Sequence, residues 1–359
     1  LAWSGHEGQR GRFVTPVKDG LLAYVRCPGC GSELRSGGLV KFGPESEGHL
    51  ECVRCGATYP VRKGIPYLLT GGKLEQTKER EVHGWKSIWQ EKGMYDHPSL
   101  EDSFRLPYIG GVWTDVARAF DMALQELSLT GSEAILDIGA GQGWASRYFA
   151  MKGCRAFAVD IVADDWYGLG RSWAIMEHAG VHFQPVVADG ENLPFACGSF
   201  DVVFMCGALH HFQNLNPILH QALRVLKPGG RLIAAGEPAI SLFTSEREAQ
   251  SNIEEAKLGI IERRPKVHEY WLALRRAGFQ SIHIDTFETF NAKPDDIRRW
   301  MRAVRQRLLQ SVRTRFKPFV WLAIGLLLLL PARLGGSLTL AINGANLFIS
   351  AVKPHDRSG

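Results

Sequence analysis

The sequence predicts an α/β protein with a doubly wound, mostly parallel sheet, a small N-terminal cysteine module and a helical insertion near the carboxy terminus. Three observations lead to this prediction. From Ala134 onward, short apolar runs alternate with helical stretches, which is the pattern of βαβ units in a parallel sheet. Four of the seven cysteines form two close pairs before this region. Near the end of the chain, a basic and apolar segment separates two strand-like runs.

The composition is that of a globular protein. The chain has 359 residues, of which 45% are apolar and 22% charged, and this length suffices for two or three domains. Its net charge of +5 is compatible with RNA binding but too mild to argue for it, because nucleic-acid binders usually carry a concentrated basic face. The first residues lack the apolar run of a secretory signal, and an odd number of cysteines suits a reducing compartment. We therefore expect a cytoplasmic protein.

Changes in composition along the chain predict six segments. Between 73 and 130 there are two helical stretches, the first with Trp85 and Trp89 four residues apart and the second at 112–127. The predicted strands of the main domain are 134–139, 155–160, 182–189, 200–206, 231–237 and 282–287. The six segments are a flexible tail (1–20), the cysteine module (21–72), a helical linker that covers a pocket (73–130), the α/β domain (131–294), an insertion (295–345), and the last strand with its tail (346–359).

A glycine-rich loop, DIGAGQGW at 137–144, ends the first predicted strand of the α/β domain. Glycines at this place allow a tight turn and a close approach of a ligand to the backbone. The loop does not fit the dinucleotide fingerprint, because Trp144 and Ser146 stand where its last glycine is required. Asp137 would also repel a pyrophosphate, whereas the sulfonium and amine of S-adenosylmethionine suit a nearby carboxylate.

Acidic residues follow the next two strands. Asp160 closes the second strand, where its carboxylate can accept hydrogen bonds from both hydroxyls of a ribose. Asp189 follows the third strand and can accept from an adenine amine. The fourth strand ends at Cys206, beside the switch point of a doubly wound sheet, where ligands bind.

The order of these motifs resembles that of class I S-adenosylmethionine-dependent methyltransferases, especially the ubiquinone/menaquinone-biosynthesis type (methyltransferase type 11). The matching motifs are DIGAGQG, VD, ADGENLPFACGSFDVV, ALHHF and ALRVLKPGGRLI, and they cover roughly residues 131–290. The resemblance implies a Rossmann-like sheet and a cofactor site in which Asp137 and the glycines hold the methionine part, Asp160 the ribose, and Asp189 with Gly190 the adenine. The cofactor-binding residues we expect are Asp137, Gly139, Ala140, Gly141, Gln142, Gly143, Asp160, Ile161, Asp189, Gly190 and Cys206.

The two cysteine pairs predict a metal site. Cys27 and Cys30 form one C-x-x-C knuckle, Cys52 and Cys55 the other, and a glycine follows each pair. Two such knuckles can place four thiolates tetrahedrally around Zn²⁺. Two disulfides or free thiols are the alternatives. The segment 52–69 is similar to Trm112-like zinc ribbons, which implies a closed, structural zinc and a module that accompanies methyltransferases.

His210 and His211, just beyond the fourth strand, are the candidate catalytic residues. Methyl transfer is an in-line displacement at an activated carbon, so the protein mainly positions the acceptor and removes its proton. A histidine has a reference pKa near neutrality and can act as that base. The alternative is that one histidine caps the next helix and the other packs on the surface. Glu237, after the fifth strand, is a further candidate base.

The acceptor pocket is expected from 75–110, 240–270 and the insertion. The aromatic residues Trp85, Trp89, Tyr95 and Trp144 either wall this pocket or pack in the core. No Asn-Pro-Pro-Tyr or Pro-Cys motif is present, which removes support from two subclasses that methylate nucleic acids.

The insertion combines a basic helix with a short apolar run. Asp295 and Asp296 open the helix, eight basic residues lie between Arg298 and Lys317, and twelve mostly apolar residues follow at 319–330. That run is too short to span a bilayer, which needs about twenty residues. Basic residues beside a leucine-rich run suit the surface of an anionic cytoplasmic leaflet. We expect peripheral membrane attachment through 295–345; packing on the own domain or on a dimer partner is the alternative.

These observations predict a cytoplasmic methyltransferase that uses S-adenosylmethionine and a structural Zn²⁺ and lies peripherally on the inner face of the membrane. Its expected acceptor is a small or lipid-linked molecule, such as a glycan or a quinone-like intermediate, with oxygen as the favoured accepting atom. One alternative is an rRNA or tRNA methyltransferase, in which the arginines of 298–317 would follow phosphates, although nucleic acid is the less favoured partner. The other is a non-catalytic, cofactor-binding partner of another methyltransferase. The sequence carries no signal for an oligomeric state.

Overall fold

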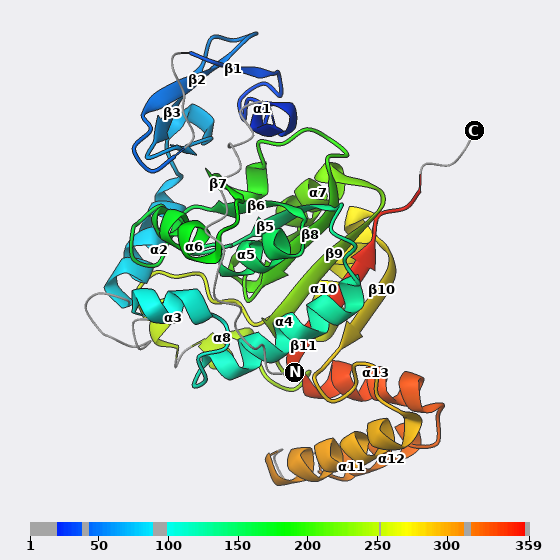
Figure 1. The fold of residues 1–359 in the computed structure, drawn as a ribbon. Coiled ribbons are helices and arrows are strands. Elements are labelled where there is room, and N and C mark those ends of the chain that lie inside the picture. Colours follow the sequence, from blue (N-terminus) through cyan, green and yellow to red (C-terminus); the bar gives the residue numbers. More distant parts are fainter. Residues whose placement is uncertain (1–19, 38–42, 89–98, 251–252, 312–316, 356–359) are drawn as a thin grey trace.

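The computed structural model of the chain describes residues 20–37, 43–88, 99–250, 253–311 and 317–355 (Figure 1). It contains a four-stranded antiparallel sheet and a seven-stranded, mostly parallel sheet with helices on both faces. The predicted fold class is therefore confirmed. The predicted tail (1–20, apart from Gly20) and the aromatic residues Trp89 and Tyr95 lie outside the described residues.

The large sheet has the strand order β10-β11-β9-β8-β5-β6-β7, and β11 alone runs antiparallel to its neighbours. Because the chain runs outward from β5 to β7 and returns to β8 on the other side of β5, the order reverses between β5 and β8. Ligands of open α/β sheets bind at such a switch point. The strands are β5 (Ala134–Ile138), β6 (Arg155–Asp160), β7 (Gln184–Val187), β8 (Phe200–Cys206), β9 (Leu226–Pro238), β10 (Gln280–Asp285) and β11 (Asn346–Val352).

The central strands are buried on both faces, as expected for a parallel sheet between two helix layers. In β8, Val202 and Phe204 join one core and Val203 and Met205 the other, since successive side chains of a strand point to opposite faces. The first core includes residues of α4 (Trp113–Leu127), α5 (Trp144–Met151) and α6 (Ser172–Ala179). The second includes residues of α7 (Leu215–Val225) and α10 (Val267–Ala277).

The cysteine module folds as a small antiparallel meander that follows α1 (Gly20–Tyr24). Its last strand leads directly into the large sheet, because Leu68 N–H donates to Val187 O at 2.8 Å and Tyr67 pairs with Val187 in a parallel bridge. The strands of the meander are β1 (Leu34–Ser36), β2 (Gly48–Cys52), β3 (Thr58–Arg62) and β4 (Ile65–Pro66).

Short helices and turns connect these parts. Between the meander and β5 lie η1 (Thr70–Gly72), α2 (Gln76–Ser87) and α3 (Leu100–Arg105). The turns η3 (Leu169–Arg171), η4 (Gly190–Asn192) and η5 (Leu209–His211) precede α6, β8 and α7. The helices α8 (Glu246–Gln250) and α9 (Glu254–Lys257) follow β9.

Three helices form the excursion between β10 and β11: α11 (Pro294–Ser311), α12 (Lys317–Leu327) and α13 (Ala332–Asn343). Figure 1 shows α11 and α12 projecting from the body of the molecule, with α13 between them and the sheet. Helix α11 buries Ile297, Met301, Val304 and Leu308, whose spacing places them on one face of the helix. Among the described residues, no helix is long and apolar enough to cross a membrane.

Candidate active site and metal centre

The glycine loop connects β5 to α5 and is fixed by backbone hydrogen bonds. The N–H groups of Gly139 and Ala140 both donate to Val159 O, at 2.9 and 3.1 Å. Gly139 has φ +70°, and a Cβ there would lie 2.5 Å from the Cβ of Ala208. Gly143 has φ +82° and approaches the ring of Phe183 equally closely. Both positions therefore require glycine.

Asp160 lies beside this loop and supports it. Its Oδ2 accepts from Gly141 N–H and its Oδ1 from Val162 N–H, both at 2.8 Å. Each carboxylate oxygen has a second lone pair for a ligand. Burial raises the pKa of Asp160.

A cavity of about 440 Å³ opens over the ends of β5, β6 and β8. Of the expected cofactor residues, nine line it: Gly139, Ala140, Gly141, Gln142, Asp160, Ile161, Asp189, Gly190 and Cys206. Trp85 and Trp144 also line it, with Leu106 and Ile261 from the segments expected to form the acceptor pocket. No described residue of 295–345 lines it, which differs from the expectation, because α13 joins the sheet at the far strands β10 and β11.

Asp137 and Gly143 lie beneath the loop and not in the cavity wall. Asp137 Oδ2 accepts from the backbone N–H and the hydroxyl of Ser146, at 3.1 and 2.8 Å, and so supports the first turn of α5. Burial raises the pKa of Asp137 to about 7, although the Ser146 hydrogen bonds oppose this. Ser146 thus occupies Oδ2 of Asp137, and the contact to the methionine part that the resemblance implies for Asp137 stays a prediction.

Gln142 has a buried side-chain oxygen that a polar ligand in the cavity could bind. Its side chain is buried, and Nε2 donates to Trp166 O at 3.2 Å. Its Oε1 is buried with no hydrogen-bond partner among the described residues. A buried acceptor without a partner costs about 1–3 kcal/mol, and the amine of S-adenosylmethionine would supply one.

Helix α2 covers the cavity and brings charged groups that the sequence analysis missed. Lys78, buried, forms ion pairs with Asp189 and Glu191 of the turn after β7. Burial alone would lower the pKa of Lys78, but the two hydrogen bonds outweigh it and the pKa is raised. Asp189, expected at the adenine, is therefore held by a cation from α2. The sequence could have predicted these residues from their spacing, because Lys78, Glu81 and Trp85 lie three and four residues apart on one helix face.

Glu81, also on α2, is a buried carboxyl in the cavity wall. Burial raises its pKa to about 8, and the negative charge of Asp160 adds to this rise. Glu81 is thus protonated near neutral pH in the structure as described. A cation placed in the cavity would lower its pKa again.

His210 is not among the residues that line the cavity and lies in a network of acids. Its Nδ1 donates to Glu237 Oε2 at 2.8 Å, and its Nε2 lies 3.5 Å from Glu262 Oε2. Burial alone would lower the pKa of His210, but hydrogen bonding to Glu237 and Glu262 outweighs burial and raises it to about 9. The imidazole is therefore charged at neutral pH, and a charged imidazole has no lone pair for a proton.

Glu237 is fully buried and organises the turn after β8. Its Oε1 accepts from the N–H groups of Ala208 and Leu209, and its Oε2 accepts from His210 N–H, each at 3.0 Å. Burial would raise the pKa of Glu237, but the hydrogen bond and charge of His210 lower it. This geometry makes Glu237 a positioning residue for the turn.

His211, unlike His210, lines the cavity. Its Nδ1 donates to Ile261 O at 2.5 Å, so that Nε2 is left as the acceptor of the neutral ring. Burial, with the neighbouring charge of His210, lowers the pKa of His211 to about 4. Of the two candidate histidines, the structure thus brings only His211 to the cavity in a form that can accept a proton.

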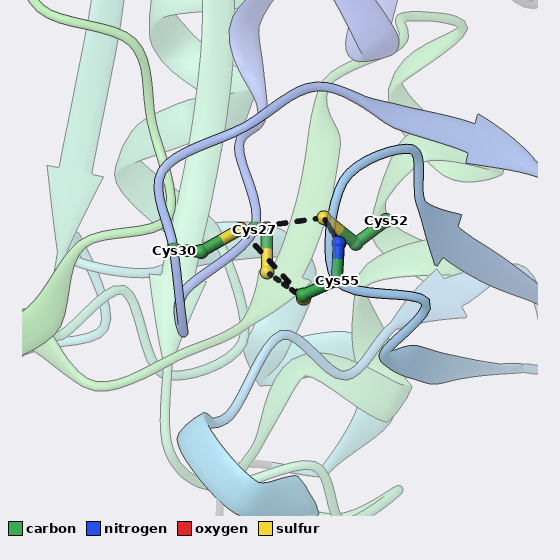
Figure 2. Close-up of side chains that lie close together, drawn as sticks. All are labelled: Cys27, Cys30, Cys52 and Cys55. Carbon is green, nitrogen blue, oxygen red and sulfur yellow. Dashed lines mark hydrogen bonds between the residues drawn. The ribbon is translucent and has the colours of Figure 1, made fainter.

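The four cysteines expected as metal ligands lie together (Figure 2). The Sγ–Sγ distances are 3.8 Å between Cys27 and Cys55, 3.4 Å between Cys30 and Cys52, and 3.6 Å between Cys30 and Cys55. Tetrahedral Zn²⁺ with Zn–S bonds of about 2.3 Å requires sulfurs roughly 3.8 Å apart. All four are free thiols and not disulfides. The donor set and its spacing fit a closed zinc site.

Comparison with known proteins agrees with the fold and the loop. Residues 136–234 match the family model described as a methyltransferase domain. The demethylmenaquinone methyltransferase of Tropheryma whipplei (strain Twist) is 35% identical over 113 residues, which are 31% of this chain and 44% of that protein. The one of Beutenbergia cavernae is 33% identical over 147 residues, 35% of this chain and 57% of that protein. The chain thus spans about half the length of these curated relatives.

A solved structure with a similar fold is phosphoethanolamine N-methyltransferase 2 of Haemonchus contortus in complex with phosphomonomethylethanolamine and S-adenosylhomocysteine. It has a TM-score of 0.51 and 16% identity, and covers 81% of this chain and 62% of that one. At this identity the likeness shows the fold alone. Sheet order, glycine loop and family match together define a Rossmann-like domain of the class I methyltransferase type. Residues 136–234 thus match a methyltransferase domain, in the place where the motif order predicted one.

Proposed function

We propose that the protein transfers a methyl group from S-adenosylmethionine to a small or lipid-linked acceptor, and that its cysteine cluster holds a structural Zn²⁺. The observation that carries this proposal is the cavity at the switch point of the sheet, walled by the glycine loop, Asp160 and the unpartnered Gln142 Oε1.

The residues present fit the cofactor. Asp160 has free lone pairs for ribose hydroxyls, Gln142 Oε1 for the amine, and Asp189 with Gly190 form the wall expected at the adenine. When bound, S-adenosylmethionine supplies a methyl group on a positively charged sulfur. The acids around the cavity complement that charge.

Glu81 and His211 are the candidate bases for the acceptor's proton. They lie next to each other, with 3.8 Å between His211 Nδ1 and Glu81 Oε1. The charge of the bound cofactor would lower the pKa of Glu81 from about 8 and ionise it near neutral pH, where a general base works best. Neutral His211 offers Nε2. A hydroxyl acceptor needs such a base, and for this reason we propose oxygen as the accepting atom.

The relatives bear on the class of acceptor. Their name, demethylmenaquinone methyltransferase, supports a quinone-like acceptor carried on a lipid. The cavity is lined by aromatic and aliphatic side chains such as Trp85, Trp113 and Ile261, which suits an apolar ring system. We propose that the protein acts in the cytoplasm on the inner face of the membrane, where such an acceptor is available.

Calorimetric titration with S-adenosylhomocysteine, and with NADH as the control, tests this function. We expect micromolar binding of the first compound and none of the second, and methyl transfer to quinol-type hydroxyl compounds in an acceptor screen. Binding of neither compound would contradict the proposal and favour a partner protein without activity of its own.

A further inference from the structure

One face of α12 presents large apolar side chains to solvent. Phe319, Leu322, Leu326 and Leu329 are 59, 55, 54 and 80% exposed. They lie three, four and three residues apart, so the first three share one face of the helix and Leu329 continues it just beyond the helix end. We call these four residues the apolar face of α12. All four side chains are more than half exposed, and contiguous exposed apolar surface usually marks an interaction site.

The apolar face is continuous with a loop of the methyltransferase domain. The ring of Phe319 packs edge-on against that of Phe243, with 6.3 Å between centroids. Phe243 and Leu242 are themselves exposed. The loop is tied to α13, because Leu242 N–H donates to Ile342 O at 2.9 Å.

The segment that carries the apolar face is strongly basic. The segment 294–343 has nine Arg and Lys against two Asp, a net charge of +7. Because the whole chain has +5, the remainder has a net charge of −2. Arg299 and Arg302 are exposed on α11, and the guanidinium of Arg305 lies 4.5 Å from the ring centroid of Trp321. The positive charge of the molecule is thus concentrated on the helices that present the apolar face.

We infer that the apolar face of α12 docks into the head-group region of an anionic lipid bilayer, with the arginines of α11 contacting the lipid phosphates. Exposed apolar side chains on an arginine-rich group of helices fit a surface that is negative outside and apolar a few ångströms below. Helix α12 has eleven residues, about 16 Å of helix against a bilayer core of about 30 Å, so the helix lies in the interface. Binding to a neutral protein partner would not account for the excess of arginine.

A chain of contacts leads from this surface to the cavity. Lys266 Nζ donates to Leu242 O at 3.1 Å, and Arg263 N–H donates to His210 O at 3.2 Å. In the same segment, Ile261 O accepts from His211 in the cavity wall. These contacts connect the docking surface with the cavity wall, so docking would bring the cavity near a lipid-linked acceptor. This consequence rests on the proposed function; the docking itself does not.

Vesicle flotation of the full chain tests the docking without any cofactor. We expect the protein to float with vesicles of phosphatidylcholine and phosphatidylglycerol, and to float far less with phosphatidylcholine alone or at high salt.

The variant L322Q/L329Q should have a vesicle affinity at least about tenfold lower than the wild type, because two apolar side chains no longer enter the interface. R299Q/R302Q should lose about fivefold for each arginine on anionic vesicles only. The matched control is L100Q/M151Q, which changes two exposed apolar residues elsewhere and should float like the wild type.

Circular dichroism and thermal unfolding confirm that each variant is folded. Wild-type protein that stays in the bottom fraction with both vesicle types would overturn the inference. So would equal loss in L322Q/L329Q and in the control. A dimer that L322Q/L329Q converts into a monomer, with unchanged flotation, would assign the apolar face to a second copy of the chain. Flotation without binding of S-adenosylhomocysteine would leave the docking standing and contradict only the proposed function.

Discussion

Asp160 combines two tasks in one side chain. Its carboxylate fixes the loop through Gly141 N–H and the following turn through Val162 N–H, and its remaining lone pairs face the cavity. We predict that Asp160→Ala weakens binding of S-adenosylhomocysteine by about tenfold or more, since hydrogen bonds to a charged acceptor are worth about 1.5–3 kcal/mol each. Calorimetry gives the affinity. Asp285→Ala, which also removes an aspartate at the end of a strand (β10) but lies outside the cavity wall, should bind normally; equal weakening in both would remove Asp160 from the site.

Glu81 makes stability depend on pH. Its pKa is raised from 4.5 to about 8 in the folded protein, so between these values the folded state holds a proton that the unfolded state has lost. Stability therefore falls as pH rises through this window. In Glu81→Gln the neutral amide resembles the protonated acid. The melting temperature of this variant relative to wild type should thus rise from pH 5 to pH 9. A constant difference across this range would show that Glu81 titrates normally.

Apart from Trp85, the cavity residues that the sequence could predict follow strand ends. The glycine loop, Asp160 and Asp189 are found in this way, because the carboxyl ends of parallel strands meet at one edge. Lys78 and Glu81 come from a helix before the domain, and only tertiary packing brings them to the cavity. His210 also follows a strand end, but its ring is bonded to the buried Glu237 and does not line the cavity, which the pattern alone does not reveal.

At the level of elements, Glu237 joins the end of β9 to the turn after β8. In Glu237→Gln, one oxygen still accepts hydrogen bonds, but the new NH₂ group faces the N–H and charged ring of His210. We predict a loss of about 3 kcal/mol in the free energy of unfolding, as for breaking a buried ion pair. Urea denaturation measures it. Glu262→Gln removes the other, more distant carboxylate of His210 (3.5 Å) and should cost clearly less; the reverse order would contradict this account of the turn.

The strands were predictable because their apolar runs are long and regularly interrupted, and β5, β6 and β8 begin within one residue of expectation. The strands β7 and β10 begin two residues from their expected starts, at Gln184 and Gln280, and β9 differs more. The strand β9 begins at Leu226 and includes Pro228-Gly229-Gly230, since Leu226 already pairs with Phe200. The basic helix expected up to Lys317 is described as α11 to Ser311, the rest of it lies outside the described residues, and a second described helix starts at Lys317.

On the scale of the whole molecule, the cysteine module and the methyltransferase domain share one core. Leu50, Cys52 and Tyr59 belong to the same buried cluster as Phe157 and Phe200. Tyr24, which precedes the first knuckle, packs against both phenylalanines, with ring centroids 4.6 and 5.5 Å apart. The two parts are therefore expected to unfold together.

The first knuckle also contacts the cavity wall. Asn192 Nδ2 donates at 3.3 Å to the carbonyl of Pro28, between the ligands Cys27 and Cys30. Asn192 ends the turn that begins with Gly190, next to Asp189. On the other side, Leu68 holds Val187 just before this turn. The position of the predicted adenine wall thus depends on the order of the cysteine module.

We therefore predict that loss of the metal weakens cofactor binding as well as stability. Cys52→Ser should lower the zinc content and the melting temperature together, because zinc binding is coupled to folding, and should weaken S-adenosylhomocysteine several-fold through the turn at Asn192. Elemental analysis, thermal unfolding and calorimetry provide the three measurements. Cys197→Ser, at an exposed cysteine outside the cluster, should change none of them. If Cys52→Ser loses zinc but keeps the wild-type cofactor affinity and unfolds in two separate transitions, the module is independent of the domain, and the shared core does not couple them.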